Sequence, residues 1–151
     1  MPRILIFASL LLLPAIGWAG DAVAVIDQEK LKLAARCETL SFSEDFVTLD
    51  DLNFDQIDDA VTHGGGVTCN GKKGPECTML GCPFRVYAGQ DNGGFRLAAE
   101  VTAFSYHAGY RYGVKVIQFQ LAAMHCGKTS LSPCTLTARL HGDRLEIISK
   151  E

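Results

Sequence analysis

Six cysteines follow an apolar N-terminal leader, and they constrain what this chain can fold into more than any other feature of its sequence. Residues 1–19 are typical of a secretory signal, because Arg3 precedes an apolar run from Ile4 to Leu13 that is too short to span a membrane. An uncleaved N-terminal anchor is the alternative, which the same shortness disfavours. We expect cleavage after Ala19, no stable membrane association afterwards, and one domain over residues 20–151. The sequence therefore predicts a periplasmic or secreted protein.

The six cysteines predict disulfides, because an even number of them in an exported chain meets an oxidising compartment. They are Cys37, Cys69, Cys77, Cys82, Cys126 and Cys134. We expect Cys126 to pair with Cys134 across a short loop, which stabilises by roughly 2–3 kcal/mol in the chain-entropy model. Cys77 with Cys82 and Cys37 with Cys69 are the remaining guess among the 15 connectivities that six cysteines allow. Zinc held by Cys69, Cys77, Cys82 and His63 is a weaker alternative.

The charge balance argues against nucleic acid and against an anionic membrane surface as partners. Without Arg3 the chain has 13 basic and 17 acidic residues, a net charge of −4. Nucleic-acid binding is driven by basic side chains that neutralise phosphates, and an anionic membrane surface attracts the same residues. The sequence therefore predicts no nucleic-acid partner, and another protein is the partner that we expect.

The pattern of apolar residues predicts a mainly β protein with one N-terminal helix (α+β). We expect an extended lead over residues 21–29 and a helix over residues 27–36, capped by Asp27, with Leu31, Ala34 and Ala35 on one face. Short strands are expected near residues 46–49, 60–62, 83–88, 95–104, 114–121, 135–140 and 145–148. Asn92-Gly93 and Gly142-Asp143 indicate hairpin turns. The sum is a blade-like antiparallel meander of five to six strands, stabilised by disulfides.

An acidic stretch, residues 51–61, places oxygen-bearing side chains at alternate positions and then continues into an apolar strand. Its Asp51, Asn53, Asp55 and Asp59 supply the hard oxygen ligands that Ca²⁺ prefers. Asp and Asn side chains also form turns by bonding their own backbone. A loop that keeps its shape without metal is therefore the alternative to a calcium site.

This stretch resembles the calcium loop of FG-GAP and VCBS repeats, the blades of integrin-type β-propellers. The resemblance covers one repeat, about residues 47–103, and includes the turn around Asn92-Gly93-Gly94-Phe95. It implies that Asp51, Asn53, Asp55 and Asp59 bind Ca²⁺ through side chains and Ile57 through its carbonyl. Phe54 and Gln56 stand where the pattern has glycines, and a left-handed backbone there costs roughly 1–2 kcal/mol without glycine. The chain is also similar to small exported cysteine-containing proteins of proteobacteria, which implies no particular activity.

An aromatic segment, residues 105–113, is the leading candidate for partner binding. We expect it to form a loop that carries Tyr106, His107, Tyr110, Arg111 and Tyr112. Tyr and Arg are enriched at the centres of protein interfaces, whereas the alternative is that the tyrosines simply cover a small core.

We therefore expect a non-enzymatic binding or structural domain with a calcium-stabilised loop. One alternative is an inhibitor of a secreted enzyme, acting through the segment from Tyr106 to Tyr112. The other is a small secreted hydrolase with Asp55 and either Asp58 or Asp59 as its carboxylates, which requires a cleft between two carboxyls. Cys126 beside His125 is weak evidence for a nucleophile, because neighbours along a strand point to opposite faces.

Overall fold

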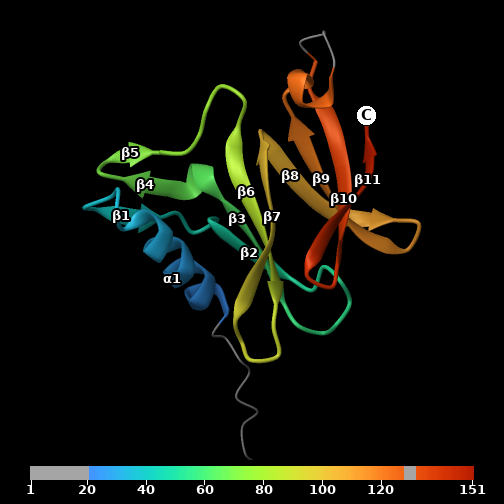
Figure 1. Cartoon of the computed structure of the whole chain (residues 1–151), viewed down its shortest axis with the longest axis horizontal. Coiled ribbons are helices and arrows are strands. Elements are labelled where there is room, and N and C mark those ends of the chain that lie inside the picture. Colours follow the sequence, from blue (N-terminus) through green and yellow to red (C-terminus); the bar gives the residue numbers. More distant parts are fainter. Residues whose placement is uncertain (1–20, 128–131) are drawn as a thin grey trace, which may run out of the picture.

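The computed structural model describes residues 21–127 and 132–151 (Figure 1). Within these ranges the chain is mainly antiparallel β with one N-terminal helix, which confirms the expected fold class. The described residues contain eleven strands in three sheets, which is more than the five or six strands expected. The expected signal, residues 1–19, and part of the loop between Cys126 and Cys134 lie outside the described residues.

Two four-stranded antiparallel sheets form the body of the domain. The first has the order β2-β3-β6-β7 and the second the order β11-β10-β9-β8. The first consists of β2 (Val47–Asp50), β3 (Asp59–His63), β6 (Cys82–Gly89) and β7 (Phe95–Ala103). The second consists of β8 (Ser105–Arg111), β9 (Val114–Leu121), β10 (Cys134–His141) and β11 (Arg144–Lys150).

A smaller sheet lies beside the first and has the order β1-β4-β5. Its strands are β1 (Leu40–Phe42), β4 (Val67–Cys69) and β5 (Lys72–Lys73). Two short 3₁₀ helices, Gly64–Gly66 and Ala123–Cys126, complete the described elements.

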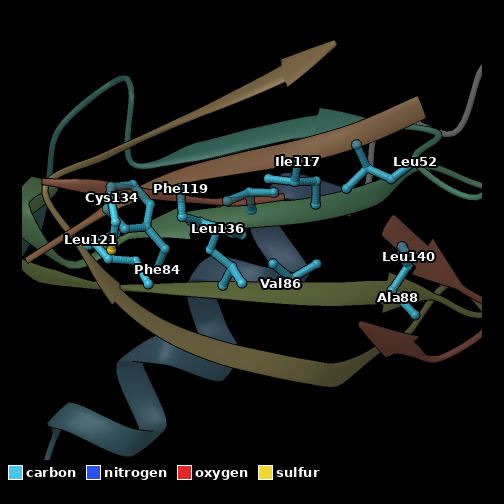
Figure 2. Packing of buried hydrophobic residues seen from close by; sticks show 12 residues of the cluster. Leu52, Phe84, Val86, Ala88, Ile117, Phe119, Leu121, Cys134, Leu136 and Leu140 are labelled. Atoms are coloured by element: carbon cyan, nitrogen blue, oxygen red, sulfur yellow. The ribbon is translucent and has the colours of Figure 1, made fainter. Parts of the chain in front are cut away.

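The two larger sheets pack face to face around the main core. Phe84 and Val86 of β6 lie against Ile117 and Phe119 of β9 and against Leu136 of β10 (Figure 2). Each set occupies alternate positions of its strand, so one face of each sheet is apolar. Burial of side chains of this size stabilises the fold by about 1.5–3 kcal/mol each, before entropy is counted.

Helix α1 (Asp21–Leu33) covers the opposite face of the first sheet (Figure 1). Val25, Glu29 and Leu33 are buried at four-residue spacing, and Val25 contacts Ala60 and Tyr87 of the sheet. The domain therefore has three layers, a helix and two sheets. Strand β6 lies in the middle layer and is buried on both faces.

The expected start of the helix is wrong. The segment expected to be an extended lead is helical from Asp21, and the helix ends at Leu33 instead of residue 36. Its buried side runs through Val25, Glu29 and Leu33, whereas Leu31 is 80% exposed. A buried glutamate interrupts the apolar pattern, which explains why periodicity pointed to the wrong face.

All six cysteines form disulfides, and the pairing is the expected one. Cys37 is bonded to Cys69, Cys77 to Cys82, and Cys126 to Cys134. The first bond joins the segment after α1 to β4, and the third joins the second 3₁₀ helix to the start of β10. No thiolate is therefore free to hold zinc or to act as a nucleophile at Cys126.

Candidate interaction surface

The acidic loop connects β2 to β3 and contains two non-glycine residues with positive φ angles. Phe54 has a φ angle of 65° and Gln56 one of 71°, both in the left-handed region. These are the two positions at which the FG-GAP pattern has glycines. The loop therefore adopts the left-handed conformation there, although neither residue is a glycine.

Side chains of the loop hold this shape by bonding its own backbone. The Asp51 carboxylate accepts the backbone N–H of Phe54 at 2.7 Å and that of Gln56 at 3.0 Å. Asn53 Oδ1 accepts the N–H of Asp55 at 3.0 Å, and Asp55 Oδ1 accepts that of Ile57 at 2.9 Å. These are turns of the kind that Asp and Asn favour, and they offset the strain of the two left-handed residues.

Asp59 is the first residue of β3, directly after the loop, and the charges of Asp51 and Asp55 act on its carboxylate. Its side chain is fully buried and accepts the backbone N–H of Leu52 at 2.8 Å and of Gly89 at 2.9 Å. Burial raises the pKa of Asp59 to about 6, although both hydrogen bonds oppose that rise. Asp59 thus ties the loop to the end of β6.

The structure brings the predicted calcium ligands only partly together. Asp51, Asn53 and Asp55 share the loop, where the Asn53 amide donates to Asp55 Oδ2 at 2.9 Å. In the described ranges, no group of three or more His, Cys, Asp or Glu side chains is arranged to hold a metal ion. The oxygen donors suit Ca²⁺ chemically, but the Asp51 and Asp55 carboxylates bond the loop backbone.

A hollow of about 400 Å³ lies beside the loop and bears on the hydrolase alternative. It lies between the end of the loop and the β6–β7 turn, and its charged lining residues are Asp58 and Asp91. Asp55 and Asp59 do not line it. The carboxyl with the raised pKa, Asp59, is buried away from this hollow. The carboxylate pair expected for hydrolysis is therefore not assembled across it.

The expectation of a loop over residues 105–113 is wrong. Residues from Ser105 to Arg111 form strand β8, which pairs with β9 from Ser105 opposite Gln120 to Arg111 opposite Val114. Tyr112 and Gly113 form the turn, with φ angles of 52° and 78°. Two positive φ angles in a two-residue hairpin are typical of a type I′ turn. Gly109 and the polar residues concealed the strand pattern in the sequence.

The five predicted binding residues are divided between the two faces and the tip of this hairpin. Tyr106 points toward the core, where its ring centroid lies 5.3 Å from that of Phe84. Tyr110 is 69% exposed and Tyr112 is 94% exposed, and Arg111 between them is also exposed. His107 is exposed on the strand itself. Tyr106 is thus largely a core residue, as the alternative interpretation had it.

The acidic loop and the tip of the hairpin meet at one end of the domain. Phe54 is 55% exposed, and its ring centroid lies 6.3 Å from that of Tyr110. Lys115 of β9 binds Asp50 at 2.5 Å and the Asp51 carbonyl at 2.9 Å. We call the surface formed by Phe54, Tyr110, Arg111 and Tyr112 the aromatic end.

A groove of about 500 Å³ continues from the aromatic end across the outer face of the second sheet, the face turned away from the core. Val116 on its floor is only 4% exposed. Arg139 and Glu146 form an ion pair at 2.8 Å within it, whereas Arg111 forms no ion pair with any described residue. The groove is lined by Arg111, Tyr112, Val114, Val116, Arg139, Glu146, Ile147, Ile148 and Ser149.

A buried ionic cluster between α1 and the first sheet was not expected from the sequence. Arg85 of β6 binds Glu29 of α1 at 2.9 Å, Glu76 at 2.8 Å and Glu100 of β7 at 2.5 Å. Tyr87 donates to the same Glu29, and its pKa is raised by burial and by this neighbouring negative charge. The signal for the cluster was an arginine and a tyrosine at alternate positions of a strand that is otherwise apolar.

The contacts of this cluster are those of a structural ion-pair network and not of a reactive site. Burial alone would raise the pKa of Glu76, but hydrogen bonds from Arg85 and Arg36 lower it. Every charge is paired, and the helix covers the group. Its effect is to hold α1 on the sheet.

In the part of the chain that the structure describes, no helix is both long and apolar enough for a membrane span. No protein-family model, no curated protein and no solved structure matches the chain.

Proposed function

We propose that this chain is a non-enzymatic, periplasmic or secreted domain that binds another protein through the aromatic end. The observation that carries the proposal is that Phe54, Tyr110 and Tyr112 are all more than half exposed and lie at the meeting point of two turns. Large rings in water are unfavourable, and Tyr and Arg dominate the centres of protein interfaces. A surface of this composition is best accounted for by a protein partner.

The rigidity of the aromatic end favours binding. Asp51 holds the acidic loop, the type I′ turn holds Tyr112, and Lys115 joins the two through Asp50. Side chains that are ordered before binding lose less entropy on association, which increases affinity. Export fits the three disulfides, because such bonds persist in oxidising compartments.

Site-specific photo-crosslinking in the cells that produce the protein tests this function. A photoreactive phenylalanine analogue at position 112 is expected to give one discrete protein adduct. The same analogue at position 31, which is exposed on the helix at the other side of the domain, is the matched control and is expected to give none. Absence of an adduct at position 112, or the same adducts at both positions, would contradict protein binding through this end.

An inhibitor of a secreted enzyme is a second candidate, favoured by the shape of the hairpin tip. Tyr112 is almost fully exposed at a convex turn that a cleft could receive. In the same crosslinking experiment, an adduct with a hydrolase whose turnover falls in the presence of this protein supports inhibition. A partner without catalytic activity supports plain binding.

We also propose that the acidic loop is of the FG-GAP and VCBS type and takes up Ca²⁺ through Asp51, Asn53, Asp55 and the Ile57 carbonyl, with Asp59 beneath. The left-handed Phe54 and Gln56 support this, because that backbone shape belongs to the calcium loop. The ion would stabilise the loop, with the weak affinity of extracellular modules, about 10⁻⁴–10⁻³ M.

Thermal unfolding with 5 mM Ca²⁺ and with chelator tests the calcium site. We expect Ca²⁺ to raise the Tm of wild type but not that of Asp55→Ala. Asp91→Ala, which changes an exposed carboxylate outside the loop, should respond as wild type does. An unchanged wild-type Tm contradicts calcium binding and leaves the protein-binding proposal intact.

A further inference from the structure

Strand β8 is an open edge of the second sheet. The strand order is β11-β10-β9-β8, so β8 pairs with β9 alone, over seven residues and without a register shift. The opposite edge, β11, is protected by a register shift opposite Thr137 and Ala138 and by Arg144 and Lys150. Natural edges are usually protected by bulges, lysines or prolines. Strand β8 contains no lysine or proline.

The turn determines which backbone groups of β8 are free. In a two-residue type I′ hairpin the pair that flanks the turn is hydrogen-bonded, here Arg111 with Val114. Hydrogen bonds to β9 then fall on the odd-numbered residues of β8. The N–H and C=O groups of Tyr106, Ala108 and Tyr110 therefore point away from β9, toward the space in which a further strand would lie.

The two faces of β8 differ in chemistry. The even-numbered residues lie on the core side, where Tyr106 and Ala108 pack against the core and Tyr110 contacts Phe54. The odd-numbered residues lie on the outer face with His107 and Arg111, beside the groove. Among the described residues, Glu146 is the only carboxylate that lines this groove, and Arg139 and His141 already bind it. On the groove side of the edge the free charge is therefore the positive charge of Arg111.

These observations identify the class of segment that fits. We infer that β8 takes up an extended segment of a partner protein as an additional antiparallel strand, with apolar and acidic side chains at alternate positions. Its apolar side chains lie beside Tyr106 and Tyr110, its acidic side chains lie toward His107 and Arg111, and its backbone pairs with the three free residues. The inference rests on the proposed protein-binding function and names the segment that is bound.

Fluorescence anisotropy with a labelled seven-residue peptide tests the inference. The probe is acetyl-Glu-Val-Glu-Phe-Glu-Val-Glu-amide, whose length equals that of β8. We expect it to bind, and we expect two altered peptides to bind at least about tenfold more weakly, a difference of 1.4 kcal/mol. One carries lysine in place of each glutamate. The other is N-methylated at its three apolar residues and so lacks the N–H groups that pair with β8.

Two variants test the site on the protein. Ala108→Pro removes an N–H that points away from β9, a position at which an edge strand tolerates proline. Arg111→Glu reverses the free charge without touching the backbone. We expect each to weaken binding of the probe by about tenfold or more. Lys72→Glu makes the same charge change on β5 of the small sheet and should bind the probe as wild type does.

The inference is overturned by no binding of the probe below about 1 mM, by equal binding of the lysine peptide, or by full binding of the probe to Arg111→Glu. The Arg111→Glu result decides the question even if Ala108→Pro misfolds. A dimer seen by sedimentation that Ala108→Pro dissociates also overturns it, because a second copy then occupies β8. If the probe does not bind but the crosslink at position 112 persists, strand addition is lost and protein binding remains. If the crosslink is lost as well, both proposals are wrong.

Discussion

Lys115 lies 2.5 Å from Asp50, and this contact joins the hairpin of β8 and β9 to the acidic loop. The Lys115 side chain is mostly buried, so the pair is shielded from solvent more than an ordinary surface pair. Burial alone would lower the pKa of Lys115, but the hydrogen bond to Asp50 raises it. The aromatic end therefore depends on a contact between residues that are 65 positions apart in the chain.

Replacing Lys115 by methionine should loosen the aromatic end. It removes both bonds of the ammonium group and leaves Asp50 without its partner. We expect Lys115→Met to lower the free energy of unfolding by about 1.5–3 kcal/mol in urea denaturation, the size of a hydrogen bond to a charged group. Lys30→Met, which breaks the exposed pair with Asp27, should change it by less than about 0.5 kcal/mol. Equal effects of the two changes would contradict the role given to Lys115.

Replacing Gln56 by glycine should stabilise the protein. Gln56 has a φ angle of 71°, where a side chain costs roughly 1–2 kcal/mol and glycine costs little. The greater freedom of glycine in the unfolded chain offsets part of this gain, so we expect Gln56→Gly to add up to about 1 kcal/mol in urea denaturation. Asn53 does not have a positive φ angle, and its side chain accepts the backbone N–H of Asp55. Asn53→Gly should therefore destabilise the protein. A loss of stability in Gln56→Gly would show that the loop is not strained.

Asp59 should make the protein more stable as the pH falls, which is the reverse of the usual effect of a carboxylate. Its pKa is about 6 in the folded protein because of burial, above the ordinary value of 3.8. Between these two values the folded state binds a proton that the unfolded state does not. The contribution of Asp59 to the free energy of unfolding therefore rises as the pH falls from about 6 toward 4.

The difference in stability between wild type and Asp59→Asn isolates this contribution. Urea denaturation from pH 7 to pH 4 should show wild type gaining stability relative to the variant as the pH falls. The pKa of His63 is lowered by burial, which acts in the opposite direction, but His63 is present in both proteins and cancels. A carboxyl resonance of Asp59 that titrates near pH 4 in NMR would contradict the prediction.

Arg85→Met should strongly destabilise the fold. The substitution leaves Glu29, which is fully buried, without its arginine. Lys32 at 3.0 Å and the Tyr87 hydroxyl still bind Glu29, so we expect a cost somewhat below the about 3–5 kcal/mol of an uncompensated buried charge. Arg139→Met, which breaks a half-exposed pair with Glu146, should cost less than about 1 kcal/mol. The double variant Arg85→Met with Glu29→Leu should recover part of the loss, and failure to recover any would mean that packing, not charge, explains it.

Local sequence patterns predicted much of the fold correctly. Alternating residues placed most strands of the two large sheets, and the short loop between them placed Cys126 with Cys134. The hairpins at Asn92-Gly93 and Gly142-Asp143 also form, each with a glycine at positive φ. Such features depend on residues that are close in sequence, so their chemistry can be read directly from it.

Other features needed the tertiary structure. Strand β8 was missed because Gly109 and polar residues obscure its alternation, and only pairing with β9 stabilises it. The backbone bonds of Asp51 and Asp55 were also invisible in the sequence, because the partners of these carboxylates depend on how the loop closes.

The sequence by itself thus determined most strands of the two large sheets, the turns at Asn92-Gly93 and Gly142-Asp143 and the Cys126–Cys134 disulfide, because these follow from neighbouring residues. Only the tertiary structure decided that α1 covers the first sheet and buries Arg85 and Tyr87. It alone brought Phe54 against Tyr110. Packing of one layer on another joins distant residues through total buried area and shape, which no local pattern encodes.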